Sequence, residues 1–172
     1  MNNKTKFFIL SFLLLISTTL TQCTKEGPPG PKGEVNMSSY YYTADNWSLN
    51  SSSQWYTAIS IPELTTGNID NAAVLVYFKV ATVWRALPYT EINTTNYFMG
   101  FYHSVGRVDV LWTYNGIGSG DDPNDYFNTS VKYKIVVIPA SQRLANPDLD
   151  WNDYEAVKQR FNLHEKPAQQ LH

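Results

Sequence analysis

Alternation with a period of two runs through most of this chain beyond residue 34. In the segment 131–138, every odd position holds a β-branched or aromatic residue, while Lys132 and Lys134 stand at even positions. Successive side chains of a strand lie on opposite faces, whereas a helix repeats every 3.6 residues. Pro139 then ends the segment, because proline cannot donate to a central ladder. The pattern predicts that β-strands are the main elements.

Segments of the same kind recur at short intervals, with turn-forming Gly, Pro, Asn and Asp residues between them. We expect strands over residues 35–42, 55–61, 73–80, 82–87, 97–102, 108–114 and 131–138. Residues 73–80 are apolar on both faces, which indicates a central, fully buried strand. About seven short strands with regular turns favour an all-β fold, an antiparallel β-sandwich, over βαβ units.

One helix is expected near the C-terminus. Asn152 is placed to cap it, with Glu155 three residues later in the capping-box position. Three apolar residues recur on one helical face: Tyr154, Val157 and Phe161. We expect the sandwich and this helix to occupy residues 35–164, and residues 165–172 to form a flexible tail.

The N-terminus carries a separate signal. Lys4 and Lys6 precede an apolar run over residues 7–20. The run is shorter than the roughly 20 residues that span a bilayer, and it is typical of a signal peptide removed after export. Cys23 is the only cysteine, so no intrachain disulfide can form and stability must come from packing. Removal of residues 1–22 leaves about one domain.

Residues 20–23, Leu-Thr-Gln-Cys, resemble the lipobox of bacterial lipoproteins. In that family the cysteine thiol is joined to a diacylglycerol, and the new amino group is then acylated. Leu20 stands at the usual aliphatic position, whereas Gln22 replaces the small residue that usually precedes the cysteine. The resemblance implies a lipid on Cys23, and two or more acyl chains anchor stably. The alternatives are cleavage at residues 19–21, which releases a soluble protein, and an intermolecular disulfide.

Residues 24–34 are polar and rich in Gly and Pro. Glycine recurs at every third position over residues 27–33, as in collagen, but three triplets are too few to hold a triple helix. We therefore interpret residues 23–34 as the lipidated cysteine and a stiff polyproline-type tether. A remnant or nucleus of trimerisation is the alternative.

The order of lipobox, Gly-Pro triplets, aromatic-rich β domain and terminal helix is similar to that of small lipoproteins from Bacteroidetes-type bacteria. The residues that carry this resemblance are Val-Val-Ile-Pro at 136–139 and Asp-Tyr-Glu-Ala-Val-Lys at 153–158. The resemblance implies anchoring in the outer membrane, with exposure at the cell surface as a further expectation. It lends no established activity.

The charge balance excludes some partners. The chain has 13 basic and 15 acidic residues, a net charge of −2, which becomes −4 without Lys4 and Lys6. A mildly acidic chain with no basic cluster in its sequence argues against nucleic acid as a partner and against polybasic attraction to lipid. We therefore expect membrane attachment through Cys23, with a glycan or an envelope protein as the further partner.

Aromatic residues make up 15% of the chain. Tyr and Trp suit both pleated sheets and wet binding surfaces. The three tyrosines at 40–42 must place rings on both faces of a strand, which predicts some exposed aromatic surface. A glycan could stack on such rings, and the candidate ligand-binding residues are Tyr40, Tyr42, Trp47 and Trp84. The alternative is that each ring only fills the core or an edge.

The acidic loop over residues 118–125 offers a weak calcium candidate. Its oxygen ligands would come from Asp121, Asp122, Asn124 and Asp125. The spacing does not match an EF-hand loop. Asx turns in a solvated loop are the simpler interpretation.

No catalytic motif is present: the chain lacks a Gly-x-Ser-x-Gly elbow, His-Glu-x-x-His, a P-loop and a dinucleotide fingerprint. We expect a non-catalytic binding or assembly domain that needs no cofactor. A glycan-binding accessory module and a small envelope hydrolase are the alternatives. Coplanar exposed rings would favour glycan binding, whereas an uncovered strand edge near Tyr40 would favour assembly.

Overall fold

The structure is a computed structural model that describes residues 36–50, 54–91, 97–114 and 122–171. The signal peptide, Cys23 and the Gly-Pro tether lie outside the described residues, as does Asp121. What the sequence predicts for them therefore stays a prediction. Within the described part of the chain, no helix has the length and apolar character that crossing a bilayer requires.

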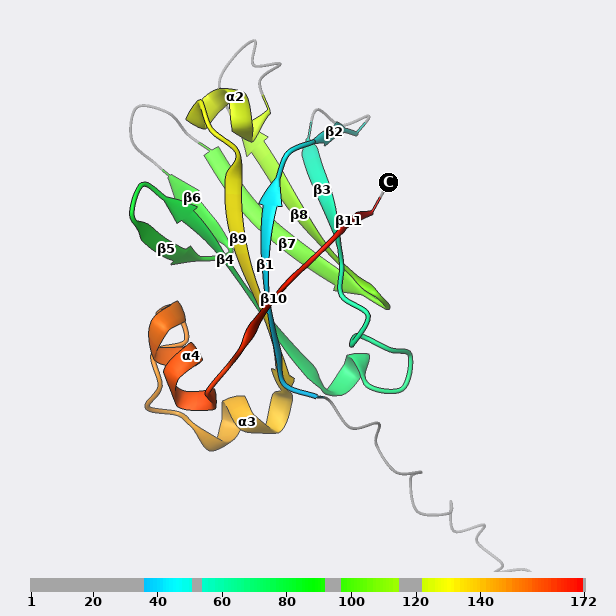
Figure 1. Cartoon of the computed structure of the whole chain (residues 1–172), viewed down its shortest axis with the longest axis vertical. Helices are drawn as coiled ribbons and strands as arrows, with labels where there is room; N and C mark the ends of the chain where they lie inside the picture. The colour runs from blue at the N-terminus through cyan, green and yellow to red at the C-terminus, as the bar shows by residue number, and fades with distance from the viewer. Residues whose placement is uncertain (1–35, 51–53, 92–96, 115–121, 172) are drawn as a thin grey trace, which may run out of the picture. The chain divides into compact units, whose positions relative to one another are not determined.

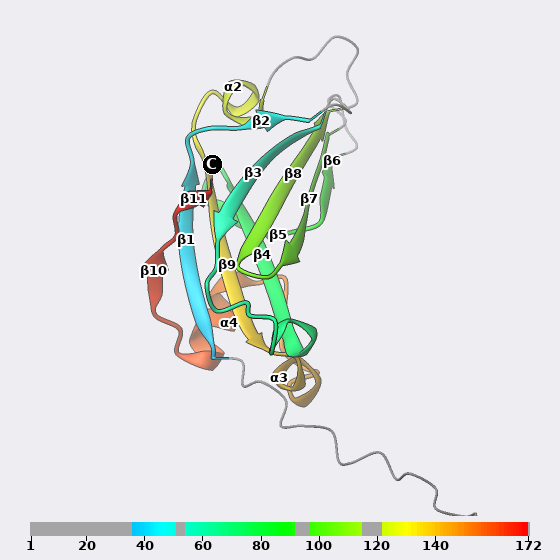
Figure 2. The ribbon, with the colours of Figure 1, turned by 90° about the vertical axis from the view of Figure 1, so that its right-hand side faces the viewer.

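Two β-sheets pack face to face (Figures 1 and 2). The first sheet has the strand order β10-β1-β9-β4-β5. Its strands are β1 (Ser38–Ala44), β4 (Ala72–Val80), β5 (Val83–Ala86), β9 (Val131–Pro139) and β10 (Glu165–Pro167). The second sheet has the order β11-β3-β8-β7-β6, and β2 pairs with β3. Its strands are β2 (Ser48–Leu49), β3 (Trp55–Ser60), β6 (Tyr89–Glu91), β7 (Tyr97–Ser104), β8 (Arg107–Tyr114) and β11 (Gln170–Leu171).

The all-β prediction is confirmed, whereas the count of about seven strands is too low. The strands that the sequence pattern missed, β2, β6, β10 and β11, have two or three residues each. So short a segment shows no recognisable alternation. The sheets are also not purely antiparallel, because β10 runs parallel to β1.

Strand β4 is buried on both faces, as its sequence predicts. Its residues Val74, Val76 and Phe78 belong to the core between the sheets. Its residues Leu75 and Tyr77 belong to a second cluster on the outer face of the first sheet. This outer cluster exists because a helix covers that face.

The covering helix is α4 (Tyr154–Phe161), whose Tyr154 and Val157 are buried in the outer cluster. The predicted helix is therefore confirmed, with its cap one residue later than expected. The Asp153 carboxylate accepts hydrogen bonds from the backbone N–H groups of Glu155, at 2.9 Å, and Ala156, at 3.3 Å.

Two α-helices were not expected: α2 (Pro123–Phe127) and α3 (Ala140–Ala145). The 3-10 helix η1 (Ile69–Asn71) lies within residues 63–71, whose Thr, Gly and Asn residues indicate a turn or one short helical turn. Helix α3 contains no buried residue, so no apolar stripe was needed to form it. Figure 1 shows α3 and α4 at one end of the domain and α2 at the other.

The prediction of a flexible tail over residues 165–172 is wrong, because residues 165–167 and 170–171 form strands. Strand β10 pairs with β1, and β11 pairs with β3 of the other sheet. Between them, Ala168 N donates to Tyr41 O at 3.0 Å and Ser60 N donates to Gln169 O at 2.8 Å. The tail thus joins the two sheets along one side and covers the edge of β1 near Tyr40.

Ala81 ends β4 in the left-handed region, with a φ of 51°. This region is costly for a residue with a Cβ and free of that cost for glycine. We expect Ala81→Gly to raise the free energy of unfolding by about 0.5–1 kcal/mol. Urea unfolding checks this, with Ala86→Gly inside β5 as the matched control that should lower stability.

Buried tyrosines make the fold sensitive to alkaline pH. Burial raises the pKa of Tyr97 to about 12 and also raises the pKa of Tyr77 and Tyr133. The folded chain therefore keeps these phenols protonated at pH values where the unfolded chain ionises them. Stability should fall as pH rises above 10, with each group adding at most about 1.4 kcal/mol per pH unit.

Tyr97→Phe should make this fall shallower between pH 10 and 12, because the variant removes one of the phenols. Denaturant unfolding at several pH values checks the slope. Tyr102→Phe, at a half-exposed position, is the control and should keep the wild-type slope. If stability falls equally with pH in wild type and in both variants, the Tyr97 phenol does not contribute to the alkaline loss of stability.

Candidate functional site

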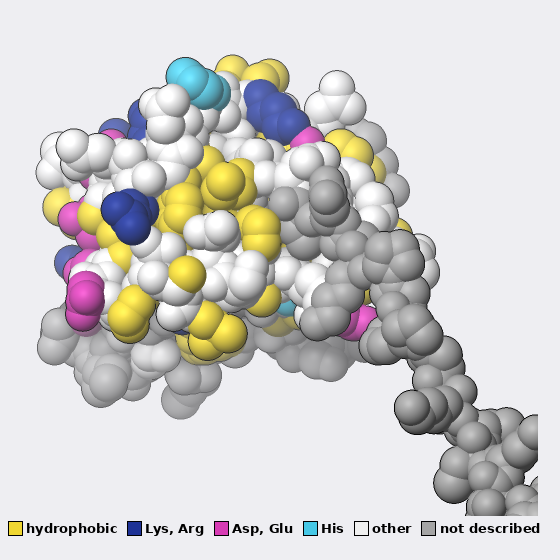
Figure 3. Space-filling view, turned by 90° about the horizontal axis from the view of Figure 1, so that it is seen from below, with side chains coloured by type: hydrophobic (Ala, Val, Ile, Leu, Met, Phe, Trp, Pro, Cys, Tyr) yellow, Lys and Arg dark blue, Asp and Glu magenta, His cyan; other side chains and the backbone are white. Residues whose placement is uncertain are grey.

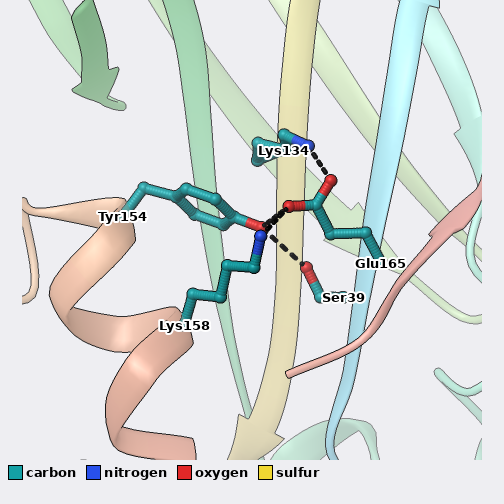
Figure 4. A network of polar contacts seen from close by, with 5 residues as sticks. All are labelled: Ser39, Lys134, Tyr154, Lys158 and Glu165. Carbon is teal, nitrogen blue, oxygen red and sulfur yellow. Dashed lines mark hydrogen bonds and ion pairs between the residues drawn. The ribbon is translucent and has the colours of Figure 1, made fainter. Parts of the chain in front are cut away.

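A polar network lies on the outer face of the first sheet, where α4, β1, β9 and β10 meet (Figure 4). Glu165 is its centre. One carboxylate oxygen accepts hydrogen bonds from Tyr154 Oη at 2.6 Å and from Lys158 Nζ at 2.9 Å. The other oxygen forms an ion pair with Lys134. Ser39 Oγ lies 3.3 Å from Tyr154 Oη and completes the network.

Aromatic rings surround the Lys134 ammonium group. Its Nζ lies 5.6 Å from the ring centre of Tyr41, 5.3 Å from that of Trp84 and 5.5 Å from that of Tyr154. Burial lowers the pKa of Lys134, and the nearby Lys158 and Lys79 lower it further, against an opposing effect of Glu155. The ring faces and the Glu165 carboxylate stabilise the charge that burial disfavours.

The network contains residue types that enzymes use, but its geometry does not present them to a substrate. Ser39 and Tyr154 are both buried. Burial raises the pKa of Tyr154, so its hydroxyl stays protonated and donates to Glu165. The arrangement joins four elements and is best understood as a structural clamp.

An exposed surface continues from the clamp toward the start of β9, and we name it the basic face. It consists of the outward side chains of β1, β9, β4 and β5: Tyr41, Thr43, Lys79, Trp84 and Lys132. Strand pairing sets Thr43 opposite Lys132 and Trp84 opposite Lys79. The Nζ of Lys79 lies 5.7 Å from the ring centre of Trp84.

Lys79 and Lys132 line one hollow of about 190 Å³. Its other lining residues are Ala81, Thr129 and Ser130. The pairing of Phe78 with Tyr133 makes the two lysines the next pair along β4 and β9. None of the ion pairs found among the described residues includes either lysine. Like charges on opposed strands are destabilising, so an anion would stabilise this arrangement.

The structure divides the predicted ligand-binding aromatics. Tyr40, Tyr42 and Trp47 are buried, so they offer no exposed ring to a glycan. Tyr42 donates or accepts a hydrogen bond with Thr57 Oγ1 at 2.9 Å, and Trp47 Nε1 donates to Asn124 Oδ1 at 3.3 Å. These three rings therefore serve the interior of the domain.

Trp84 alone of the predicted set belongs to the outer surface, where it is partly buried. Tyr41, which the sequence analysis did not select, is 46% exposed on the same face. The tyrosines at 40–42 alternate between the faces of β1, as expected. The signal that would have selected Tyr41 is its phase: it stands one residue out of step with the core positions.

Three residues of the acidic loop are described, and their side chains have different roles. Asp122 caps α2, accepting from the backbone N–H groups of Asn124 at 2.8 Å and Asp125 at 3.1 Å. Asn124 Oδ1 accepts from Val131 N, and its Nδ2 donates to Ala44 O. Among the described residues, no group of three or more His, Cys, Asp or Glu side chains is placed to hold a metal ion. The capping and Asx interpretation fits Asp122, whereas the side chain of Asn124 joins the end of β1 to the start of β9.

Comparisons with protein-family models, with curated proteins and with solved structures found no match for this chain.

The clamp yields a stability prediction. Glu165→Gln removes the charge that balances Lys134, of which only 12% of the side chain is exposed. We expect a loss of about 2–3 kcal/mol in the free energy of unfolding, because an uncompensated buried charge is costly. Adding Lys134→Met to this variant should recover much of the loss. Glu155→Gln, at an exposed position of α4, is the control and should stay within about 0.5 kcal/mol of wild type.

Denaturant unfolding of wild type, Glu165→Gln, Lys134→Met and the double variant forms a double-mutant cycle. Additive effects of Glu165→Gln and Lys134→Met would contradict the view that the pair acts as a unit.

Proposed function

We propose that this chain is an exported, lipid-anchored, non-catalytic binding protein whose basic face holds an anionic carbohydrate. The observation that carries the proposal is the hollow between Lys79 and Lys132, two neighbouring cations with no carboxylate among the lining residues. A sulfate or carboxylate group there would accept hydrogen bonds from both ammonium groups. Charge-assisted hydrogen bonds of this kind are stronger than neutral ones.

A carbohydrate suits this face better than a free anion does. The exposed Tyr41 ring offers an apolar face on which a sugar ring can stack, and the exposed part of the Trp84 ring beside Lys79 adds apolar surface. The hydroxyl groups of Thr43, Thr129 and Ser130 can donate to or accept from sugar hydroxyls. The face is shallow and lies along the strands, which suits an extended polymer more than a small molecule.

The anchoring part of the proposal rests on the sequence. The lipobox-like residues 20–23 and the Gly-Pro tether support attachment of Cys23 to the outer membrane, with the domain held outside the cytoplasm. The assembly alternative loses its strongest argument, because β10 covers the edge of β1 near Tyr40. The hydrolase alternative would need a pair of carboxyl groups facing a substrate, and the hollow has none among its lining residues.

Three polymers with one backbone test the ligand: dextran, carboxymethyl-dextran and dextran sulfate. We expect the folded domain to bind the two anionic polymers and not dextran, more weakly as salt is raised. The variant Lys79→Gln/Lys132→Gln should bind at least about tenfold more weakly, a loss of about 1.4 kcal/mol. Isothermal titration calorimetry gives the affinities.

The matched control is Arg85→Gln/Arg143→Gln, which removes the same charge from exposed positions outside the basic face. It should bind like wild type. If both double variants lose affinity equally, net charge and not the basic face is responsible. Stronger binding to inorganic polyphosphate than to either anionic dextran would count against a carbohydrate ligand.

The anchor has its own test. The mass of the mature N-terminal peptide, taken from membrane fractions of the native host, should show a triacylated Cys23. An unmodified peptide that begins near residue 22 would instead make this a secreted domain with a free thiol.

A further inference from the structure

Helix α3 presents an apolar side chain at the end of the domain opposite α2. Leu144 is 84% exposed, the largest exposure among the large apolar side chains described. None of the residues of α3 is buried. A single exposed leucine is ordinary on a protein surface, so its surroundings decide whether it has a role.

The position of Leu144 is held firmly. Asn146 Nδ2 donates to Gln142 O at 2.7 Å, which closes the end of α3. Arg160 Nε of α4 donates to Asn146 Oδ1 at 2.8 Å, and the Arg143 guanidinium lies 5.9 Å from the ring centre of Trp151. The fold therefore supports α3 from one side and leaves Leu144 facing outward.

The chain enters the domain at this same end. Ser38 at the start of β1 pairs with Val137 near the end of β9, and α3 begins directly after β9. Met37, which precedes β1, is 48% exposed. Figure 3 shows this end from below, with hydrophobic side chains gathered near its centre and charged side chains toward the margin.

The length of the chain between Cys23 and β1 indicates what can cover this surface. Thirteen residues separate Cys23 from Met37. Even a fully extended chain of that length spans at most about 50 Å. A domain of this size has a radius of gyration near 15 Å. A lipid on Cys23 would therefore keep the bilayer within reach of the end that carries Met37 and Leu144.

We propose that this end of the domain, which carries Met37 and Leu144 of α3, rests on the surface of the membrane that holds the lipid anchor. The inference depends on the anchoring part of the proposed function. A short tether keeps the domain at a high effective concentration near the membrane. Contacts too weak to bind a free domain to the membrane can therefore still orient a tethered one.

This orientation would direct the basic face outward. Lys132 lies at the start of β9, and α3 follows the other end of that strand. Pro139 stands seven positions after Lys132, which is a distance of about 23 Å at 3.3 Å per residue. The hollow between Lys79 and Lys132 would thus face away from the membrane, toward polymers outside it.

The test uses the mature chain, residues 23–172, joined through the Cys23 thiol to a maleimide lipid in phosphatidylcholine nanodiscs. A gadolinium-chelating lipid in the disc broadens the NMR signals of nearby amides. We expect the amides of Met37 and α3 to relax at least roughly tenfold faster than those of α2 and Lys132, given their separation of about 23 Å along β9. No such difference between the two ends would overturn the inference.

Leu144→Gln should reduce the relaxation of the α3 amides toward that of α2, because it removes the apolar contact without disturbing a buried group. Leu49→Gln on β2, at a 55% exposed position, is the matched control and should keep the wild-type pattern. If Leu144→Gln also keeps the wild-type pattern, α3 does not make the contact.

The design separates this inference from the proposals on which it depends. Chemical attachment replaces native lipidation, so a failed orientation would leave the N-terminal mass measurement to decide whether Cys23 is acylated. Polymer binding is measured on the untethered domain and does not depend on how that domain lies on a bilayer.

Discussion

The Glu165 carboxylate is the contact on which the arrangement of the C-terminal third depends. It receives Lys134 from β9 and both Tyr154 and Lys158 from α4, while its own strand β10 lies along β1 (Figure 4). Two cations in a partly buried place require a counter-charge. That counter-charge lies on β10, the strand that covers the edge of β1. One segment therefore both balances the two lysines and closes the side of the sandwich.

The closure leaves the domain with different surfaces at its two ends. Near α3 the outer face of the first sheet is covered by α4, and the exposed Met37 and Leu144 lie at this end. Toward the start of β9, the side chains of Lys79 and Lys132 on that face are exposed. The proposed binding of an anionic polymer and the proposed contact with the membrane therefore use opposite ends of the same strands.

Much of the fold follows from local patterns, and the failures share a cause. Long strands such as β9 were predictable because alternation over eight residues fits the two-residue repeat of a strand and not the 3.6-residue repeat of a helix. The tail was mispredicted because residues 165–171 have little local preference, and their strand pairing comes from β1, β3 and the Lys134 counter-charge. The candidate site was missed for a related reason: Lys79 and Lys132 are 53 residues apart, and only the pairing of β4 with β9 brings them together.

The sequence by itself determined that the chain is all-β, that α4 forms and that no intrachain disulfide stabilises the domain. These properties follow from periodicity, capping residues and the number of cysteines, which can be read without knowing the tertiary structure. Only the tertiary structure decided which tyrosine faces outward, that the last residues close the sandwich, and that a mildly acidic chain carries a basic face. Those properties depend on strand register and on pairing between distant segments, where long-range burial and charge outweigh the weak preference of each residue.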